Sequence, residues 1–188
     1  MRVFIAVEIS DEVRARAAER IEFLRKQFPQ LRVGWEKPEK LHLTIKFLGD
    51  IEPTQLADLI AAAEKSVRGF QPFELEITGA NVFPPRGAVR VLWLDVTTGK
   101  ENVLALNERL EDECWKIGFE REGRKFTPHL TVARLREPHN SQSLAKLHVA
   151  TQFPPVGCLV KEITIFQSER AADKINYKSL SKILLENK

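Results

Sequence analysis

The chain has 188 residues, of which 43% are hydrophobic and 29% are charged, and its formal net charge is +3. This length is enough to bury a hydrophobic core without disulfides or bound metals, and the composition excludes a largely disordered chain. No apolar run approaches the roughly 20 residues of a membrane-spanning helix, and the opening apolar run, which Glu8 interrupts, is too short for a signal peptide. We therefore expect a cytoplasmic protein with no membrane segment, a monomer by default, built as one domain over 1–188.

The two cysteines, Cys114 and Cys158, lie far apart in the sequence and belong to no CxxC or CxxH pattern. This excludes a disulfide framework and a zinc knuckle. The small positive charge is compatible with a phosphate-bearing partner but is too weak to argue for one.

Hydropathy patterns and turn residues predict strands that alternate with helices. An apolar run predicts a strand buried on both faces at 2–9, and Ser10 offers an N-cap to the helix that follows. The later strands are predicted at 41–48, 73–78, 90–96, 129–135, 159–166 and within 177–186. The helices are predicted at 11–28, 53–69, 100–117 and 143–149, and a loop is predicted at 34–40.

Three short identities recur in the same order at nearly one offset. Arg2-Val3 matches Arg90-Val91 at 88 residues, His42-Leu43-Thr44 matches His129-Leu130-Thr131 at 87, and Glu76-Ile77-Thr78 matches Glu162-Ile163-Thr164 at 86. The pattern predicts a tandem duplication with units at about 1–86 and 87–170. The expected fold is α+β and bilobal, with two pseudo-two-fold-related β-α-β-α-β lobes whose largely antiparallel sheets flank a central groove, a preferred place for a site.

The repeated His-x-Thr is the most informative feature. Alternate residues of a strand share a face, so His42 lies beside Thr44 and His129 beside Thr131. Two imidazoles across a groove suit a reaction that needs an acid and a base, and hydroxyls donate hydrogen bonds to phosphoryl oxygens. A lone histidine on a strand is most often structural, but the duplication argues against that reading. The sequence shows neither a nucleophile motif nor a metal-ligand pattern, so a phosphoryl reaction without metal fits best.

The residues around both motifs resemble a known family. The strings are Trp35-Glu-Lys-Pro-Glu-Lys-Leu-His42-Leu-Thr44-Ile-Lys-Phe-Leu-Gly49 and Thr127-Pro-His129-Leu-Thr131-Val-Ala-Arg134. They look like the paired HxTx motifs of the 2H phosphoesterase superfamily, and in particular its RNA 2′,3′-cyclic phosphodiesterase family, also called 2′-5′ RNA ligase or LigT-like. The resemblance covers essentially the whole chain.

The resemblance implies a site without metal or cofactor that opens an RNA 2′,3′-cyclic phosphate to a 2′-phosphate, with reversible 2′-5′ ligation of tRNA halves as a related reaction. It implies that His42 donates a proton to the departing 3′ oxygen, that His129 accepts one from water, and that Thr44 and Thr131 hold phosphate oxygens. Arg134 matches an arginine that contacts phosphate.

Strand parity bears on two phosphate-binding candidates. Parity places Arg134 away from His129, so Arg134 reaches the phosphate only if the strand twists, bulges or ends there. Lys46 has the parity of His42 and is also predicted to bind phosphate.

Two other functions stay open, namely an RNA-end-binding protein without turnover and a phosphodiesterase of a small cyclic nucleotide. Further basic and aromatic residues are candidates for RNA contacts. Arg121, Arg124 and Lys125 are candidates to guide RNA into the groove, with a solvated loop as the alternative. Trp35 and Phe126 are candidates to stack on a base, but core packing is the stronger expectation for both.

Overall fold

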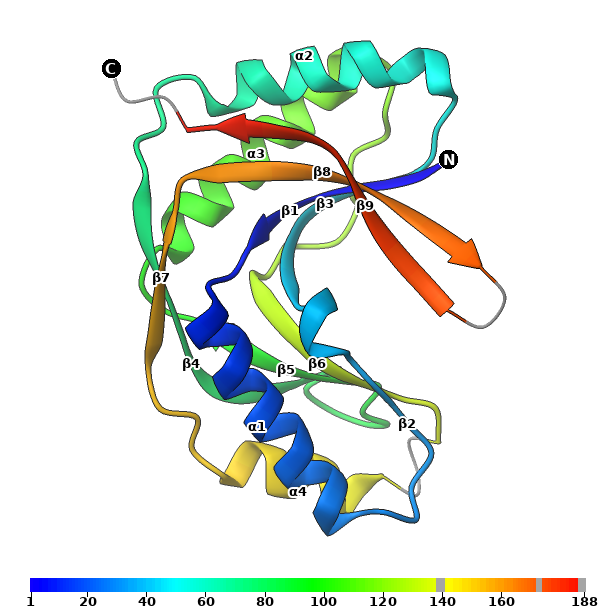
Figure 1. Cartoon of the computed structure of the whole chain (residues 1–188), viewed down its shortest axis with the longest axis vertical. Helices are drawn as coiled ribbons and strands as arrows, with labels where there is room; N and C mark the ends of the chain where they lie inside the picture. The colour runs from blue at the N-terminus through cyan, green and yellow to red at the C-terminus, as the bar shows by residue number, and fades with distance from the viewer. Residues whose placement is uncertain (138–140, 172–173, 186–188) are drawn as a thin grey trace.

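The structure, a computed structural model, describes residues 1–137, 141–171 and 174–185. Helices are interspersed among the strands along the chain, and the last three elements are all strands (Figure 1). The elements are β1 (Arg2–Glu8), α1 (Asp11–Gln27), β2 (Val33–Trp35), η1 (Pro38–Lys40), β3 (His42–Asp50), η2 (Pro53–Gln55), α2 (Leu56–Val67), β4 (Phe73–Phe83), β5 (Val91–Val96), α3 (Lys100–Lys116), β6 (His129–Leu135), α4 (Gln142–Ala150), β7 (Val156–Val160), β8 (Glu162–Ala171) and β9 (Lys174–Leu184).

The strands form two antiparallel sheets, which confirms the predicted α+β class. The first sheet has the order β3-β1-β8-β9 and the second has the order β2-β6-β5-β4-β7. The two halves of the chain exchange strands, because β8 of the second half pairs with β1 and β4 of the first half pairs with β5. The runs β3-β1-β8 and β6-β5-β4 therefore correspond strand for strand, and each motif strand lies beside the first strand of its own half.

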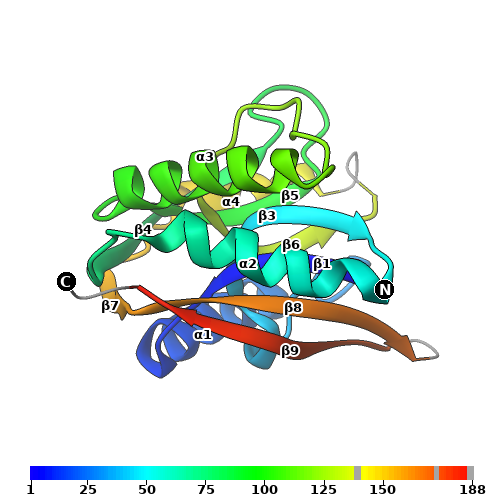
Figure 2. The same ribbon diagram turned by 90° about the horizontal axis from the view of Figure 1, so that it is seen from above.

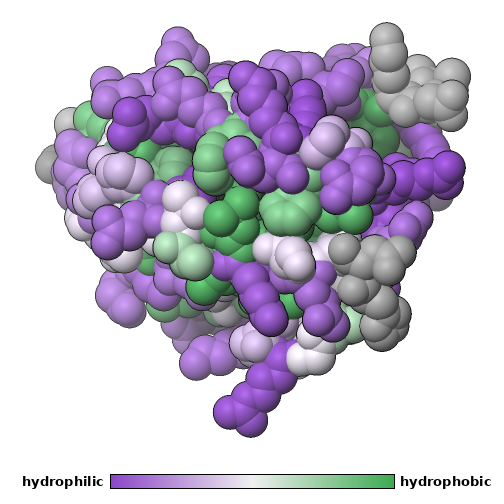
Figure 3. Space-filling view, turned by 90° about the horizontal axis from the view of Figure 1, so that it is seen from below, coloured by the Kyte–Doolittle hydropathy of each residue, from purple (hydrophilic) through white to green (hydrophobic). Residues whose placement is uncertain are grey.

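Helices cover the outer faces of both sheets. Helices α2 and α3 pack on each other and on strands of the first sheet, whereas α1 and α4 pack on the second, as Figures 1 and 2 show from two directions. Seen from the α1 and α4 side, the surface is hydrophilic toward its rim with hydrophobic residues near its middle (Figure 3). None of the helices in the described residues is both long and apolar enough to cross a membrane.

Local signals explain most of the element boundaries. The Ser10 hydroxyl accepts a hydrogen bond from the Val13 N–H at 3.3 Å, so it caps α1 as predicted. The five central residues of β1 are buried, as expected for a strand between two others. The predicted loop at 34–40 instead begins with the short strand β2.

The C-terminal strands also differ from the prediction. The single strand expected at 159–166 is divided between β7 and β8, which lie in different sheets. β9 begins at Lys174, earlier than expected, and the predicted end at residue 186 lies outside the described residues.

Both motif strands contain the same irregularity. In β3, Thr44 opposes Ala6 and Lys46 opposes Ile5, so Ile45 is an extra residue. In β6, Thr131 opposes Trp93 and Ala133 opposes Leu92, so Val132 is an extra residue. A bulge of one residue reverses which side chains face each side of the sheet from that point on. The position five residues after each histidine therefore returns to the histidine's own face.

Candidate active site

His42 begins β3, directly after η1 and Leu41, and two hydrogen bonds orient its ring. Its Nδ1 lies 2.6 Å from the Lys40 carbonyl oxygen, and its Nε2 lies 2.9 Å from the Thr44 hydroxyl. A carbonyl oxygen only accepts, so Nδ1 carries the hydrogen and donates it. In the neutral ring Nε2 then accepts from Thr44, and in the imidazolium it donates.

His129 repeats this arrangement at the start of β6. Its Nδ1 lies 2.7 Å from the Thr127 carbonyl oxygen, so that nitrogen also donates to the backbone two residues earlier. Thr131 lies two residues later on the same face of the strand. In both motifs the backbone therefore holds Nδ1 and leaves Nε2 as the nitrogen for chemistry.

Aromatic rings enclose each imidazole. Phe4 stacks on His42 with ring centroids 4.8 Å apart, and Tyr177 meets it edge to face at 5.2 Å. Phe83 and Trp93 meet His129 edge to face at 5.1 Å and 5.7 Å. These rings remove water from the imidazoles and fix their planes.

This enclosure controls the protonation of both histidines. Burial lowers the pKa of His42, the Lys40 carbonyl raises it, and the positive charges of Arg134 and Arg14 lower it further. Burial also lowers the pKa of His129, against the Thr127 carbonyl and the Asp95 carboxylate, which raise it. Both rings are therefore mainly neutral at pH 7 in the free protein.

One guanidinium lies within electrostatic range of both histidines. Arg134 lowers the pKa of His42 and also that of His129, and strands β3 and β6 contact each other. The Arg134 side chain is 61% exposed, and its Nε lies 3.6 Å from a Glu36 carboxylate oxygen. The bulge at Val132 turns Arg134 onto the face of His129. Strand parity required such a bulge, a twist or a strand end for Arg134 to reach a phosphate beside His129.

Lys46 does not lie at this site, and its predicted phosphate contact was wrong. The bulge at Ile45 turns its side chain into the interior, where it is 1% exposed. Its Nζ donates to a Glu111 carboxylate oxygen at 2.7 Å and to the Glu120 carbonyl at 3.3 Å. The assumption of continuous alternation along β3 caused the error.

The structure adds three residues that the sequence did not indicate. Strict alternation along the strand predicted at 41–48 would put Phe47 on the face opposite His42, but Phe47 is 63% exposed on the face of His42, with its ring 6.1 Å from that of Phe4. Glu36 pairs with Arg134, and burial raises the pKa of its carboxyl group. Tyr177 comes from β9, and its pKa is raised by burial and by the charge of Glu36, against the charge of Arg134, which lowers it. Only the bulge and the pairing of distant strands bring these three residues together.

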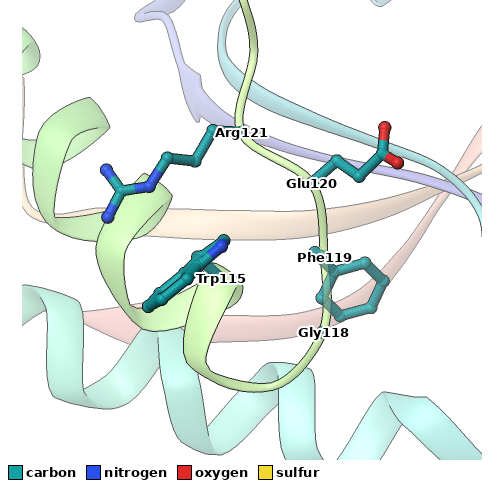
Figure 4. Close-up of a pocket in the computed structure, with 5 residues that line it drawn as sticks. All are labelled: Trp115, Gly118, Phe119, Glu120 and Arg121. Atoms are coloured by element: carbon teal, nitrogen blue, oxygen red, sulfur yellow. The ribbon is translucent and has the colours of Figure 1, made fainter.

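A cavity of about 260 Å³ lies away from both histidines. It is lined by Trp115, Gly118, Phe119, Glu120 and Arg121 at the C-terminal end of α3 (Figure 4). Arg121 lies over the Trp115 ring at 5.5 Å and pairs with Asp112 at 2.7 Å, so its charge is already matched.

The described residues contain no group of three or more His, Cys, Asp and Glu side chains placed to hold a metal ion. The side chains at the site itself offer two oriented imidazoles, two hydroxyls and one exposed guanidinium.

Comparison with known proteins shows the family of the chain. The family model of the 2′-5′ RNA ligase superfamily matches residues 10–172. The chain belongs to this superfamily. One relative, the RNA 2′,3′-cyclic phosphodiesterase of Methanothermobacter thermautotrophicus, is 36% identical over 170 residues, which is 90% of each chain. A second, the RNA 2′,3′-cyclic phosphodiesterase of Thermotoga maritima, is 32% identical and covers 89% of this chain and 87% of its own.

Two solved structures share the fold over nearly the full length of the chain. The Thermus thermophilus protein TT0787 matches with a TM-score of 0.78 and 28% identity, covering 98% of each chain. Escherichia coli LigT, crystallised with 3′-AMP, matches with a TM-score of 0.75 and 25% identity, covering 99% of this chain and 98% of its own.

Proposed function

We propose that this protein hydrolyses the 2′,3′-cyclic phosphate at an RNA end to a 2′-phosphomonoester, using His42 and His129 and no metal. The observation that carries the proposal is the pair of imidazoles, each held through Nδ1 by a backbone carbonyl and each influenced by Arg134. Two relatives that cover most of the chain are named RNA 2′,3′-cyclic phosphodiesterase, and a structural neighbour was crystallised with a nucleoside phosphate.

In the proposed reaction a water oxygen attacks phosphorus while Nε2 of His129 takes its proton. The bond from phosphorus to O3′ breaks, and Nε2 of His42, present as imidazolium, gives its proton to O3′. Thr44, Thr131 and Arg134 hold the non-bridging oxygens, where charge accumulates in the transition state. The bound phosphate anion favours the imidazolium that the lowered pKa of His42 otherwise disfavours.

The first test is a product assay. An RNA oligonucleotide that ends in a 2′,3′-cyclic phosphate is incubated with the protein in EDTA, and the product phosphate is located. A 2′-phosphomonoester is expected, with a loss of roughly 10²–10⁴-fold in rate for His42→Ala and for His129→Ala. Full activity in either variant would refute the two-histidine mechanism.

A modified substrate tests which histidine is the acid. When sulfur replaces O3′, the leaving group no longer needs a proton. We expect this substrate to restore much of the rate of His42→Ala but not that of His129→Ala. Rescue of His129→Ala alone would reverse the two roles.

A second reaction follows from the same chemistry. If the hydroxyl of another RNA end replaces water, the site forms a 2′-5′ linkage and its reverse cleaves one, and the name of the matching family favours this possibility. Joining of tRNA halves in the same assay would support it. The proposal keeps the expectation of a monomer in the cytoplasm.

A further inference from the structure

An exposed end of the second sheet carries three arginines in one register. Here β2 begins and β6 ends side by side (Figure 1), with Gly34 opposite Arg134 and Val33 opposite Leu135. Arg32 directly precedes β2 and Arg136 directly follows β6, so both lie one position beyond the last paired residues, Val33 and Leu135. Because alternate residues of a strand share a face, we infer by continuing this register one step that Arg32 and Arg136 lie on the face of Arg134. We call these three residues the arginine row.

The bulge at Val132 connects the arginine row to the candidate active site. Thr131 opposes Trp93 and Arg134 opposes Val91, two residues apart on β5, so Arg134 lies on the face of Thr131. In the continued register, Arg32 and Arg136 follow Arg134 on that face toward the end of the sheet.

The outer two arginines have charges that are not matched. Both are exposed, and within the described parts of the chain neither forms an ion pair, whereas Arg134 pairs with Glu36. Glu137, beside Arg136, has interactions of its own. Arginine presents planar donors that suit phosphate, and alternate strand residues are spaced by about 6.6 Å, of the order of the step between phosphates in an extended RNA strand.

The basic loop before β6 is a weaker candidate for RNA contact. Arg121 is already paired with Asp112, and Glu120 and Glu122 flank it. Residues 120–125 carry three basic and two acidic side chains, so their net charge is only +1.

We propose that Arg32 and Arg136 bind the phosphodiester backbone of RNA immediately upstream of the terminal cyclic phosphate, so that the arginine row selects a polynucleotide over a mononucleotide. This inference rests on the proposed function, because the row leads away from the phosphate that Arg134 would hold.

The test compares two substrates on one protein. The values of kcat/KM are measured for an RNA oligonucleotide with a 2′,3′-cyclic end and for adenosine 2′,3′-cyclic phosphate. We expect Arg32→Gln/Arg136→Gln to lose roughly tenfold or more on the oligonucleotide and to change by less than about twofold on the mononucleotide. The slope of log kcat/KM against log salt for the oligonucleotide should become shallower by about 1.4, because two phosphate contacts are lost.

Lys65→Gln/Arg68→Gln is the matched control, because it removes the same charge from two exposed positions at the C-terminal end of α2. It is expected to leave both substrates within about twofold of wild type. An equal loss on both substrates in the arginine-row variant, no loss on either, or a comparable oligonucleotide loss in the control would overturn the inference. Failure of the wild-type protein to turn over either substrate would instead overturn the proposed function itself.

Discussion

Phe47 and Arg134 occupy corresponding positions, five residues after the histidine of each motif. Both face the site because of corresponding bulges, yet one is an exposed aromatic ring and the other an exposed guanidinium. A nearly symmetric scaffold therefore presents an apolar surface near His42 and a charged group near His129. A nucleotide has the same asymmetry, with a flat base at one end and a phosphate at the other.

We expect Phe47→Ala to weaken turnover without weakening the fold. Stacking of a base on an aromatic ring is worth about 1–3 kcal/mol, so kcat/KM on the cyclic-phosphate oligonucleotide should fall by roughly 5- to 150-fold. The thermal midpoint should change little, because the side chain is 63% exposed. Phe23→Ala on α1, where the ring is 40% exposed, is the control. A stability loss that accounts for the reduced activity would argue against a stacking role.

The sequence predicts the first three residues of each motif and fails after them. His42 and Thr44, like His129 and Thr131, share a face because the strands are regular up to that point. The bulges follow at Ile45 and Val132, and neither residue type signals a bulge. Strict alternation therefore puts Lys46 and Phe47 on the wrong faces and leaves the position of Arg134 undecided. Tyr177 was missed because its place depends on pairing between β8 and β9.

At the scale of elements, the bulge in β3 gives Lys46 a structural role. The Glu111 carboxylate oxygen that accepts from its Nζ also accepts from the backbone N–H of Glu122 at 3.2 Å. This buried ion pair therefore joins β3, helix α3 and the segment that leads to His129. Its two side chains are 1% and 12% exposed, so water screens the pair little.

We expect Lys46→Met to lower the free energy of unfolding by about 3–5 kcal/mol, because it leaves a buried carboxylate without its partner. Removing both charges in Lys46→Met/Glu111→Leu should recover most of that loss. Lys116→Met, which breaks an exposed pair with Glu113, should cost about 1 kcal/mol or less. Urea unfolding measures all three. A double variant no more stable than Lys46→Met would mean that packing, rather than the unpaired charge, sets the cost.

At the scale of the whole molecule, the exchange of β4 and β8 makes each sheet depend on both halves of the chain. The sequence repeat indicated two similar units, but it could not show the exchange, because the same identities fit two separate lobes equally well. The histidines are brought together by this shared architecture. Their alignment therefore depends on the stability of the whole fold.

His148 connects helix α4 with strand β5 and with helix α1. Its ring is fully buried on α4, and its Nε2 donates to the Trp93 carbonyl at 3.1 Å, while its own carbonyl accepts from Arg20 of α1. Trp93 in turn contacts the ring of His129. Burial lowers the pKa of His148 to about 4, so the ring is neutral in the folded protein over most of the pH range.

This burial predicts a loss of stability in mild acid. An unfolded histidine has a pKa of about 6.5, so below that pH the unfolded chain binds a proton at His148 that the folded chain does not bind. The contribution of neutral His148 to the free energy of unfolding is fully present above pH ~6.5. About 3 kcal/mol of stability is lost as the pH falls toward 4. His42 and His129 add slopes of the same sign, so the difference between wild type and His148→Gln isolates His148. Urea unfolding between pH 7 and 4 should show a flatter pH dependence for His148→Gln, which keeps a neutral donor. Parallel curves for the two proteins would mean that His148 is protonated in the folded state without cost.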